Sequence, residues 1–154
     1  MTIINIAILL LFTSITLKEL KHIKSLIVPT RKSLPEIITI LFSIIVISSI
    51  TYLYANSPIH YITGILGIFM FICMWLKKGI IPQGFIGMSR GQELIEWDKI
   101  ERVIILSSKD IKVNLFGSFM EQTFNFKNDD YDNVIDILKE NLSYNADIQI
   151  IKKN

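Results

Sequence analysis

Three apolar runs without a single charged residue constrain this chain more than any other feature. They cover residues 1–17, 37–54 and 59–76. A helix needs about 20 mostly apolar residues to cross the hydrocarbon core of a bilayer, so the second and third runs are long enough and the first lies at the lower limit. A chain in lipid must satisfy its backbone hydrogen-bonding groups internally, so these isoleucine-rich runs are expected to form helices. The sequence therefore predicts three transmembrane helices.

The second and third runs form a predicted helical hairpin at residues 37–78. Asn56, Ser57 and Pro58 provide a short polar connection, and the proline suits the start of a helix. The first run could instead be a cleaved signal peptide. It lacks the basic n-region of a signal peptide and has no small-x-small cleavage site before Lys18. We therefore interpret it as a retained helix at residues 1–17.

The distribution of charge predicts the orientation. Residues 1–78 contain seven Lys or Arg and two acids, whereas residues 79–154 contain nine bases and twelve acids. The bases of the first half all follow the first or the third run, and the connection at 55–60 has none. The positive-inside rule then places the N-terminus outside, and the loop 18–36 and the domain 79–154 in the cytoplasm. Bases that flank apolar runs do not form a nucleic-acid patch.

The loop 18–36 contains its own helical pattern. Leu20, Ile23 and Ile27 recur at helical spacing, lysines line the opposite side, and Pro29 ends the pattern. This spacing predicts an interfacial helix that anchors the topology or senses particular lipids. Candidate contacts to lipid headgroups are Lys18, Lys21, Lys24, Arg31, Lys32, Lys77 and Lys78.

The segment 93–106 decides how the second half folds. One helix would place Leu94, Trp97, Ile100 and Ile104 on a single face, but the apolar residues 103–106 would then surround it. Glycines and a proline in 79–88 exclude a regular helix there, and 89–92 is a turn by composition. Apolar residues alternate through 111–116 and 119–126. We therefore predict strands at 80–88 and 92–97, a turn at 98–101, a strand at 102–107, and two more strands after it.

The C-terminal part contains an amphipathic helix. Asn128, Asp129 and Asp130 provide a capping segment with acids at the helix start. The apolar residues that follow have the spacing of one helix face, and the helix is expected to end within 141–145. The residues are Tyr131, Val134, Ile135, Leu138 and Leu142. Residues 147–153 alternate weakly, which is typical of a last strand or a frayed tail.

These motifs resemble a known family. A strand with Gly84 and Phe85, the pattern Leu94-Ile95-x-Trp97-x-x-Ile100-x-x-Val103, a strand pair and a closing helix are similar to bacterial PH-like domains of the YcxB-like kind. The resemblance covers about residues 60–143. It implies a PH-like strand meander closed by a helix, attached to a transmembrane hairpin, in small proteins of low-GC Gram-positive bacteria. The helix at 1–17 is an addition to that pattern, and the family implies no reaction.

Residues with catalytic or metal-binding chemistry are few. His22 and His60 are predicted on opposite sides of the membrane, and Cys73 is alone inside a span. The acids at 93, 96, 98 and 101 alternate in direction and are mixed with bases, which favours a solvated face over a cation site. Asp129, Asp130 and Asp132 lack the glycine and the terminal glutamate of a calcium loop. The sequence therefore predicts no cofactor, no metal and no enzyme activity.

Three aromatic residues are candidate contacts for a partner. Trp97 is either a core aromatic beside the turn or a contact residue. Phe116 and Phe119 flank Gly117 and Ser118 at a loop tip, where apolar side chains can contact a partner or the membrane interface. Gly64 and Gly67, with Ala55 nearby, provide a small-residue surface for helix packing.

Two functions follow as hypotheses. The first is a membrane-anchored accessory protein whose PH-like domain binds a lipid or protein partner, such as a transporter, at the inner membrane face. The second is an immunity protein that protects its producer against a membrane-active bacteriocin peptide. Small, multi-span proteins without catalytic residues suit either task.

Overall fold

A computed structural model describes residues 3–89, 92–108, 110–144 and 146–152. Parts of the predicted helix at 1–17, of the predicted turn at 89–92, of the expected helix end at 141–145 and of the segment 147–153 lie outside these residues. The chain divides into two compact units. The helical unit comprises residues 1–24 and 32–77, and the β-rich unit comprises residues 25–31 and 78–154.

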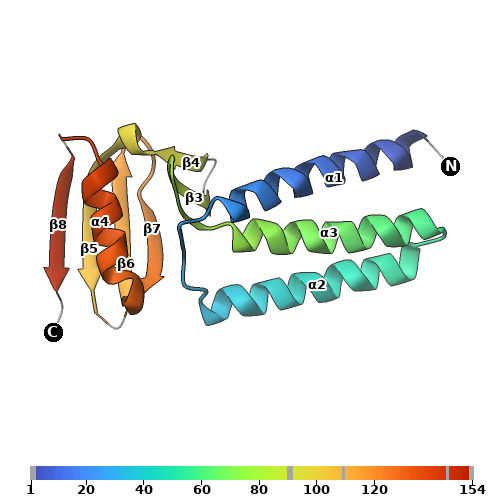
Figure 1. Cartoon of the computed structure of the whole chain (residues 1–154). Helices are drawn as coiled ribbons and strands as arrows, with labels where there is room; N and C mark the ends of the chain where they lie inside the picture. Colours follow the sequence, from blue (N-terminus) through green and yellow to red (C-terminus); the bar gives the residue numbers. More distant parts are fainter. Residues whose placement is uncertain (1–2, 90–91, 109, 145, 153–154) are drawn as a thin grey trace. The chain divides into compact units, whose positions relative to one another are not determined.

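The helical unit contains three long helices, α1 (Ile3–Lys24), α2 (Leu34–Tyr54) and α3 (Pro58–Leu76). Each is long and apolar enough to cross a membrane, as the sequence predicts. The middle helix is α3, which packs against α1 on one side and α2 on the other (Figure 1). Pro58 is the first residue of α3, where its missing N–H costs nothing because that group would have no partner inside the helix.

Two helix ends differ from the sequence prediction. Residues 18–24 do not form a separate interfacial helix, because nothing between Leu17 and Lys18 breaks the backbone pattern and α1 continues to Lys24. Ile27 lies outside that helix. The second helix begins at Leu34 instead of residue 37, because Ser33 and Glu36 form a reciprocal capping box with Pro35 in the first turn.

The β-rich unit is built from two four-stranded sheets and one helix. The first sheet has the order β1-β2-β3-β4 and the second has the order β7-β6-β5-β8. All pairs are antiparallel except β5 with β8. The strands are β1 (Val28–Pro29), β2 (Gly79–Ile81), β3 (Gly84–Ser89), β4 (Gln92–Glu96), β5 (Ile100–Ser107), β6 (Asp110–Gly117), β7 (Gln122–Lys127) and β8 (Asp147–Lys152).

The first strand of this unit comes from the segment between α1 and α2. Val28 pairs with Ile80, and the N–H groups of Ile27 and Thr30 donate to the carbonyl oxygens of Ile80 and Lys78 at 2.8 and 3.0 Å. The N–H of Arg31 donates to Asn125 O on β7 at 2.7 Å, so residues 25–31 join both sheets. The predicted boundaries, a loop at 18–36 and a domain at 79–154, therefore miss a strand that the domain takes from that loop.

The core of the β-rich unit lies between the sheets and α4 (Tyr131–Asn141). Three aromatic rings meet at its centre, with the Phe85 centroid 5.0 Å from Phe124 and 6.5 Å from Phe126. The helix presents Val134, Ile135, Ile137 and Leu138 to this core, three of which the helical spacing predicts. Asp130 makes no side-chain capping bond, and residues Asn128–Asp130 form a short 3₁₀ turn (η2) instead of a simple cap.

Three details of the strand prediction change. The segment 80–88 is two strands, because Pro82 and Gln83 form a turn between β2 and β3. The segment 93–106 is a strand, a turn and a strand, as predicted, but the turn is η1 (Trp97–Lys99) instead of 98–101, so β5 begins at Ile100 instead of residue 102. The last residues form β8, which pairs in parallel with the edge of β5.

Candidate interaction surface

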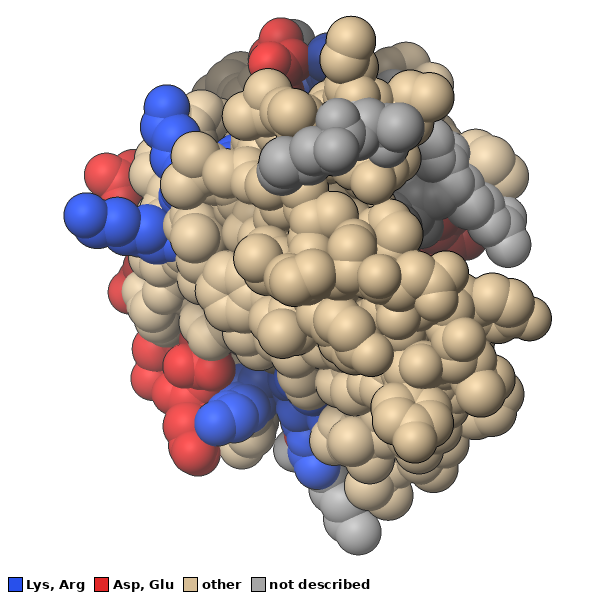
Figure 2. Space-filling model, turned by 90° about the vertical axis from the view of Figure 1, so that its right-hand side faces the viewer, with Lys and Arg blue, Asp and Glu red and all other residues tan. Residues whose placement is uncertain are grey.

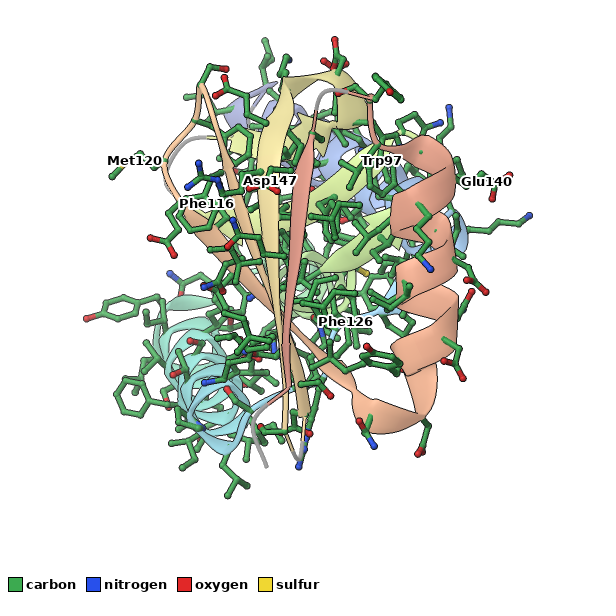
Figure 3. The ribbon with its side chains drawn as sticks, turned by 90° about the vertical axis from the view of Figure 1, so that its left-hand side faces the viewer. Trp97, Phe116, Met120, Phe126, Glu140 and Asp147 are labelled. Atoms are coloured by element: carbon green, nitrogen blue, oxygen red, sulfur yellow. The ribbon has the colours of Figure 1, made fainter. Side chains whose placement is uncertain are left out.

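Trp97 is a packed side chain of the β-rich unit. Its ring stands edge-on to Phe85 with 5.3 Å between centroids, and its Nε1–H donates to Pro82 O at 2.9 Å. Figure 3 shows Trp97 and Phe126 on the side of the second sheet that faces α4. Because the indole N–H is already bonded, Trp97 fixes the β2–β3 turn against η1. Of the two alternatives in the sequence, the contacts favour the core role.

Phe119 also points towards the protein interior. Its ring packs against the core, and a Cβ added at Gly117 would come within 2.8 Å of that ring. The same Cβ would lie 2.1 Å from Lys99 O, so the end of β6 passes η1 too closely for any side chain. Met120 is 57% exposed and lies beside Phe116 on the opposite side of the sheet from α4 (Figure 3). Sequence reasoning missed Met120, although it occupies the same loop tip.

Phe116 lies on the outer face of the second sheet, which we define as its face away from α4. Side chains alternate along β5, so that Val103 and Ile105 are fully buried while their neighbours point outwards. The strand register brings Phe116 opposite Arg102, and Ile151 opposite Leu106. The outer face is formed by Arg102, Ile104, Leu106, Lys112, Asn114, Phe116, Thr123, Asn125, Asp147, Gln149 and Ile151.

The outer face mixes apolar, amide and charged groups. Arg102 and Asp147 form an ion pair at 3.5 Å with both side chains more than half exposed, and such pairs contribute at most about 1 kcal/mol. Thr123 donates to the Asn114 amide oxygen at 3.0 Å. Ile104, Leu106 and Phe116 are each partly exposed between these polar groups. The outer face therefore combines three apolar side chains with polar neighbours of both charge signs.

The basic residues of the first half have different environments. Lys18, Lys21, Lys24 and Arg31 are exposed, and Arg31 pairs with Asp110. Lys32 donates to Trp75 O at 2.7 Å and lies 5.2 Å from the Trp75 ring centroid, while Lys78 lies 5.8 Å from the Phe124 ring. These six side chains stay candidates for headgroup contact. Lys77 is 3% exposed, and we remove it from that set.

Lys77 instead pairs with Glu19 inside the helical unit. Its Nζ lies 2.6 Å from Glu19 Oε2, and both side chains are almost completely buried. The pair ties the last turns of α1 to the end of α3. The sequence analysis missed this pair because it placed Glu19 in a solvated loop. Glu19 is the one acid among the lysines of 18–24, and that isolation is the available signal.

The candidate acid cluster does not converge. Glu96 pairs with Lys99 at 2.7 Å, and this hydrogen bond and the Glu96 charge raise the pKa of the Lys99 amine. Within the ranges that the structure describes, no three His, Cys, Asp or Glu side chains are placed to hold a metal ion. His22 lies in the last turn of α1. His60 lies in the first turn of α3, and its ring contacts Asn5 near the opposite end of α1. The two imidazoles are therefore separated by about 25 Å of helix.

Comparison with known proteins identifies one similarity. A family model described as a bacterial PH domain matches residues 2–153 of the chain. This match is longer than the segment 60–143 on which the sequence resemblance rests, and it includes α1, so the N-terminal helix is not an addition to the family pattern. No curated protein and no solved structure matches the chain.

Proposed function

Because the chain belongs to the bacterial PH-domain family, we propose that it is a non-catalytic, membrane-anchored accessory protein whose β-rich unit binds a partner protein at the cytoplasmic face. PH domains are in general interaction modules. The observation that carries the proposal is the origin of β1, which the unit takes from the segment between two apolar helices. A strand taken from the segment between two apolar helices supports a role for this module close to the membrane.

The charges at the junctions support the cytoplasmic assignment. The chain passes between the two units at residues 24–25, 31–32 and 77–78. Each passage has a base beside it: Lys24 at the first, Arg31 and Lys32 at the second, and Lys77 and Lys78 at the third. The other end of the helical unit, which faces the viewer in Figure 2, has no charged residue in the apolar helices or in the α2–α3 connection. By the positive-inside rule, the basic end faces the cytoplasm.

The outer face of the second sheet is the surface that we assign to the partner. It presents Phe116, Ile104 and Leu106 within a frame of amides. Its charges are of both signs, with Arg102 and Lys112 balanced in part by Asp147, so it is not the uniform basic patch that anionic headgroups attract. This composition favours a protein over a lipid surface, and Phe116 is its aromatic anchor.

Site-specific photocrosslinking in native membranes tests the proposal. A photoreactive phenylalanine analogue replaces Phe116 in the full chain, and the same analogue at Trp97 is the matched control because Trp97 faces the opposite side of the sheet. The proposal predicts a discrete protein adduct from position 116 and none from position 97. Lipid adducts alone at position 116 would assign the face to the membrane instead, and equal adducts from both positions would show that neither marks a specific surface.

Protection against a membrane-active peptide rests on the sequence hypothesis alone. The described residues add no observation that favours it. The same crosslinking experiment distinguishes an immunity protein from an accessory protein. An immunity protein would give an adduct with a small peptide in cells that make the bacteriocin.

A further inference from the structure

The helical unit contains a groove that the proposed function does not use. It has a volume of about 450 Å³ and lies over α3 between α1 and α2. This groove exists because both outer helices pack on α3 and hardly on each other. Most of its lining is apolar, and residues at one end are polar: Asn5, Thr51, His60 and Thr63. We name it the interhelical groove.

Two glycines of α3 form the floor of the interhelical groove, and their surroundings differ. A Cβ added at Gly64 would lie 2.3 Å from Thr51 Oγ1, so this glycine lets α2 approach α3. A Cβ added at Gly67 would meet only the Phe12 ring, at 3.5 Å, which is ordinary contact. Gly67 is therefore not needed for helix packing. Its missing side chain keeps the groove open.

The polar end of the groove is built around His60. The N–H of Asn56 donates to His60 Nδ1 at 3.2 Å, so a neutral ring carries its proton on Nε2. The amide nitrogen Nδ2 of Asn5 lies 3.3 Å from Nε2. Two N–H donors do not bond to each other, so we assign the Asn5 amide with its oxygen towards the Nε2–H group, by exchange of its nitrogen and oxygen positions. This assignment leaves the two amide N–H donors of Asn5 for another acceptor. The Thr51 and Thr63 hydroxyls donate to their own helices, at Ile47 O and Ile59 O.

The dimensions of the groove match one leaflet of a bilayer. Its lining along α3 runs from His60 to Phe71, and eleven residues of helix rise about 16 Å. Half of a ~30 Å hydrocarbon core is about 15 Å. The polar end lies at the α2–α3 connection, where the chain turns outside the hydrocarbon. An occupant that fits has one oxygen-rich end at the interface and an apolar chain of leaflet depth.

We propose that the interhelical groove is a binding site for one acyl chain of a membrane phospholipid, with an ester oxygen of that lipid accepting from the Asn5 amide. Asn5 and His60 form the polar end of the site. Gly67, which has no side chain, leaves the floor of the groove open for the acyl chain. This site belongs to the helical unit and is independent of which partner the β-rich unit binds.

Photolabelling of the full chain in nanodiscs tests the site. The probe is phosphatidylcholine with a diazirine midway along one palmitoyl chain, and labelled residues are mapped by mass spectrometry. We expect label concentrated on the lining residues Phe12, Met70 and Phe71. Gly67→Leu fills the floor and reduces this labelling about fivefold, which corresponds to roughly 1 kcal/mol of binding.

Leu53→Phe is the matched control, because Leu53 is 70% exposed on α2, outside the groove lining, and the substitution adds apolar bulk there. It leaves the label on Phe12, Met70 and Phe71 unchanged. Label spread evenly over all three helices and insensitive to Gly67→Leu would overturn the proposal in favour of ordinary surrounding lipid. Cross-linked dimers in place of lipid adducts would overturn it in favour of a second copy of the chain.

A second variant keeps the proposal testable if Gly67→Leu fails to fold. Asn5→Leu removes the amide donors without adding bulk at the floor. The proposal predicts that this variant loses lipid that co-purifies with the wild-type chain, measured by native mass spectrometry. Equal lipid retention by Asn5→Leu and wild type would contradict the polar contact.

Discussion

Gly84 occupies a backbone conformation that side chains rarely adopt. Its φ is +149°, and a Cβ there would lie 1.9 Å from Ile95 O on the neighbouring strand. The glycine is needed because β3 starts directly after the turn at Pro82 and Gln83 and must approach β4 closely.

We predict that Gly84→Ala lowers the free energy of unfolding of the β-rich unit by about 2 kcal/mol or more, because the backbone strain adds to the steric clash. Pulse proteolysis of the full chain in detergent micelles measures this change. Gly67→Ala is the matched control, since its Cβ meets Phe12 at an ordinary distance. Equal stability of Gly84→Ala and wild type would show that β3 and β4 can separate without cost.

The Glu19–Lys77 pair gives a second prediction at the residue scale. Removing one partner leaves a buried charge, which typically costs about 3–5 kcal/mol. We therefore expect Glu19→Leu and Lys77→Leu each to lower the thermal unfolding temperature of the detergent-solubilised chain. The double variant is expected to recover most of the loss, because no charge is then left unpaired. Additive losses in the double variant would show that the two side chains act independently.

Single residues show the limit of sequence reasoning most clearly. Trp97 and Phe116 are both aromatic and both adjoin turns, yet one bonds to Pro82 O and the other lies on the outer face. The alternation along β6 already places Phe116 opposite in direction to Leu115. The direction of Trp97 depends on η1, a turn whose geometry no local pattern specifies.

Secondary structure elements were largely predictable where a period is strong. The helix at 131–141 follows from its apolar spacing, and the strands β6 and β7 follow from alternation. Strand β5 follows instead from the continuous apolar run at 103–106, which a single helix face cannot accommodate. The end of α1 was not predictable, because bases usually mark the end of a span. Here the helix continues past Lys18, and Glu19 pairs with Lys77. Strand β1 is two residues long, and no periodicity can reveal so short an element.

Strand β8 is the element with the clearest protective role. It covers the edge of β5 in parallel register, and Ile150 and Ile151 stay 44% and 49% exposed. Its removal would lose little buried area but would leave the N–H and C=O groups of β5 without partners at an open edge. The element therefore replaces the long, isoleucine-rich edge of β5 with a shorter edge that carries the polar residues Asp147 and Gln149, while Ile148 packs against the core.

We predict that a chain ending at Ala146 stays folded and self-associates, because the β5 edge is then free to pair. Light scattering coupled to gel filtration in detergent measures this as an increase in mass per particle. A control variant, Gln149→Thr, keeps the strand and is expected to run as wild type. A truncated chain with the wild-type mass would show that the edge is protected without β8.

At the scale of the whole molecule, the sequence predicted three membrane helices followed by a PH-like domain. Three helices that are long and apolar enough to cross a membrane are present, and the family is confirmed. The strand that the β-rich unit takes from between α1 and α2 was not predictable, because it depends on a pairing between Val28 and Ile80, which are about fifty positions apart along the chain. Long-range register of this kind follows from the complete fold and not from local composition.

The central claim is that the β-rich unit is complete only with the segment between α1 and α2. The most direct test compares two soluble fragments by urea unfolding: residues 78–154 alone, and residues 25–31 joined to residues 78–154 by a short glycine linker. Val28 is 1% exposed, and burial of one such side chain contributes about 1.5–3 kcal/mol. We predict that the joined fragment unfolds cooperatively and is more stable than residues 78–154 alone by at least this amount. Equal stability of the two fragments would contradict the claim, because β1 would then be an accessory to a domain that folds without it.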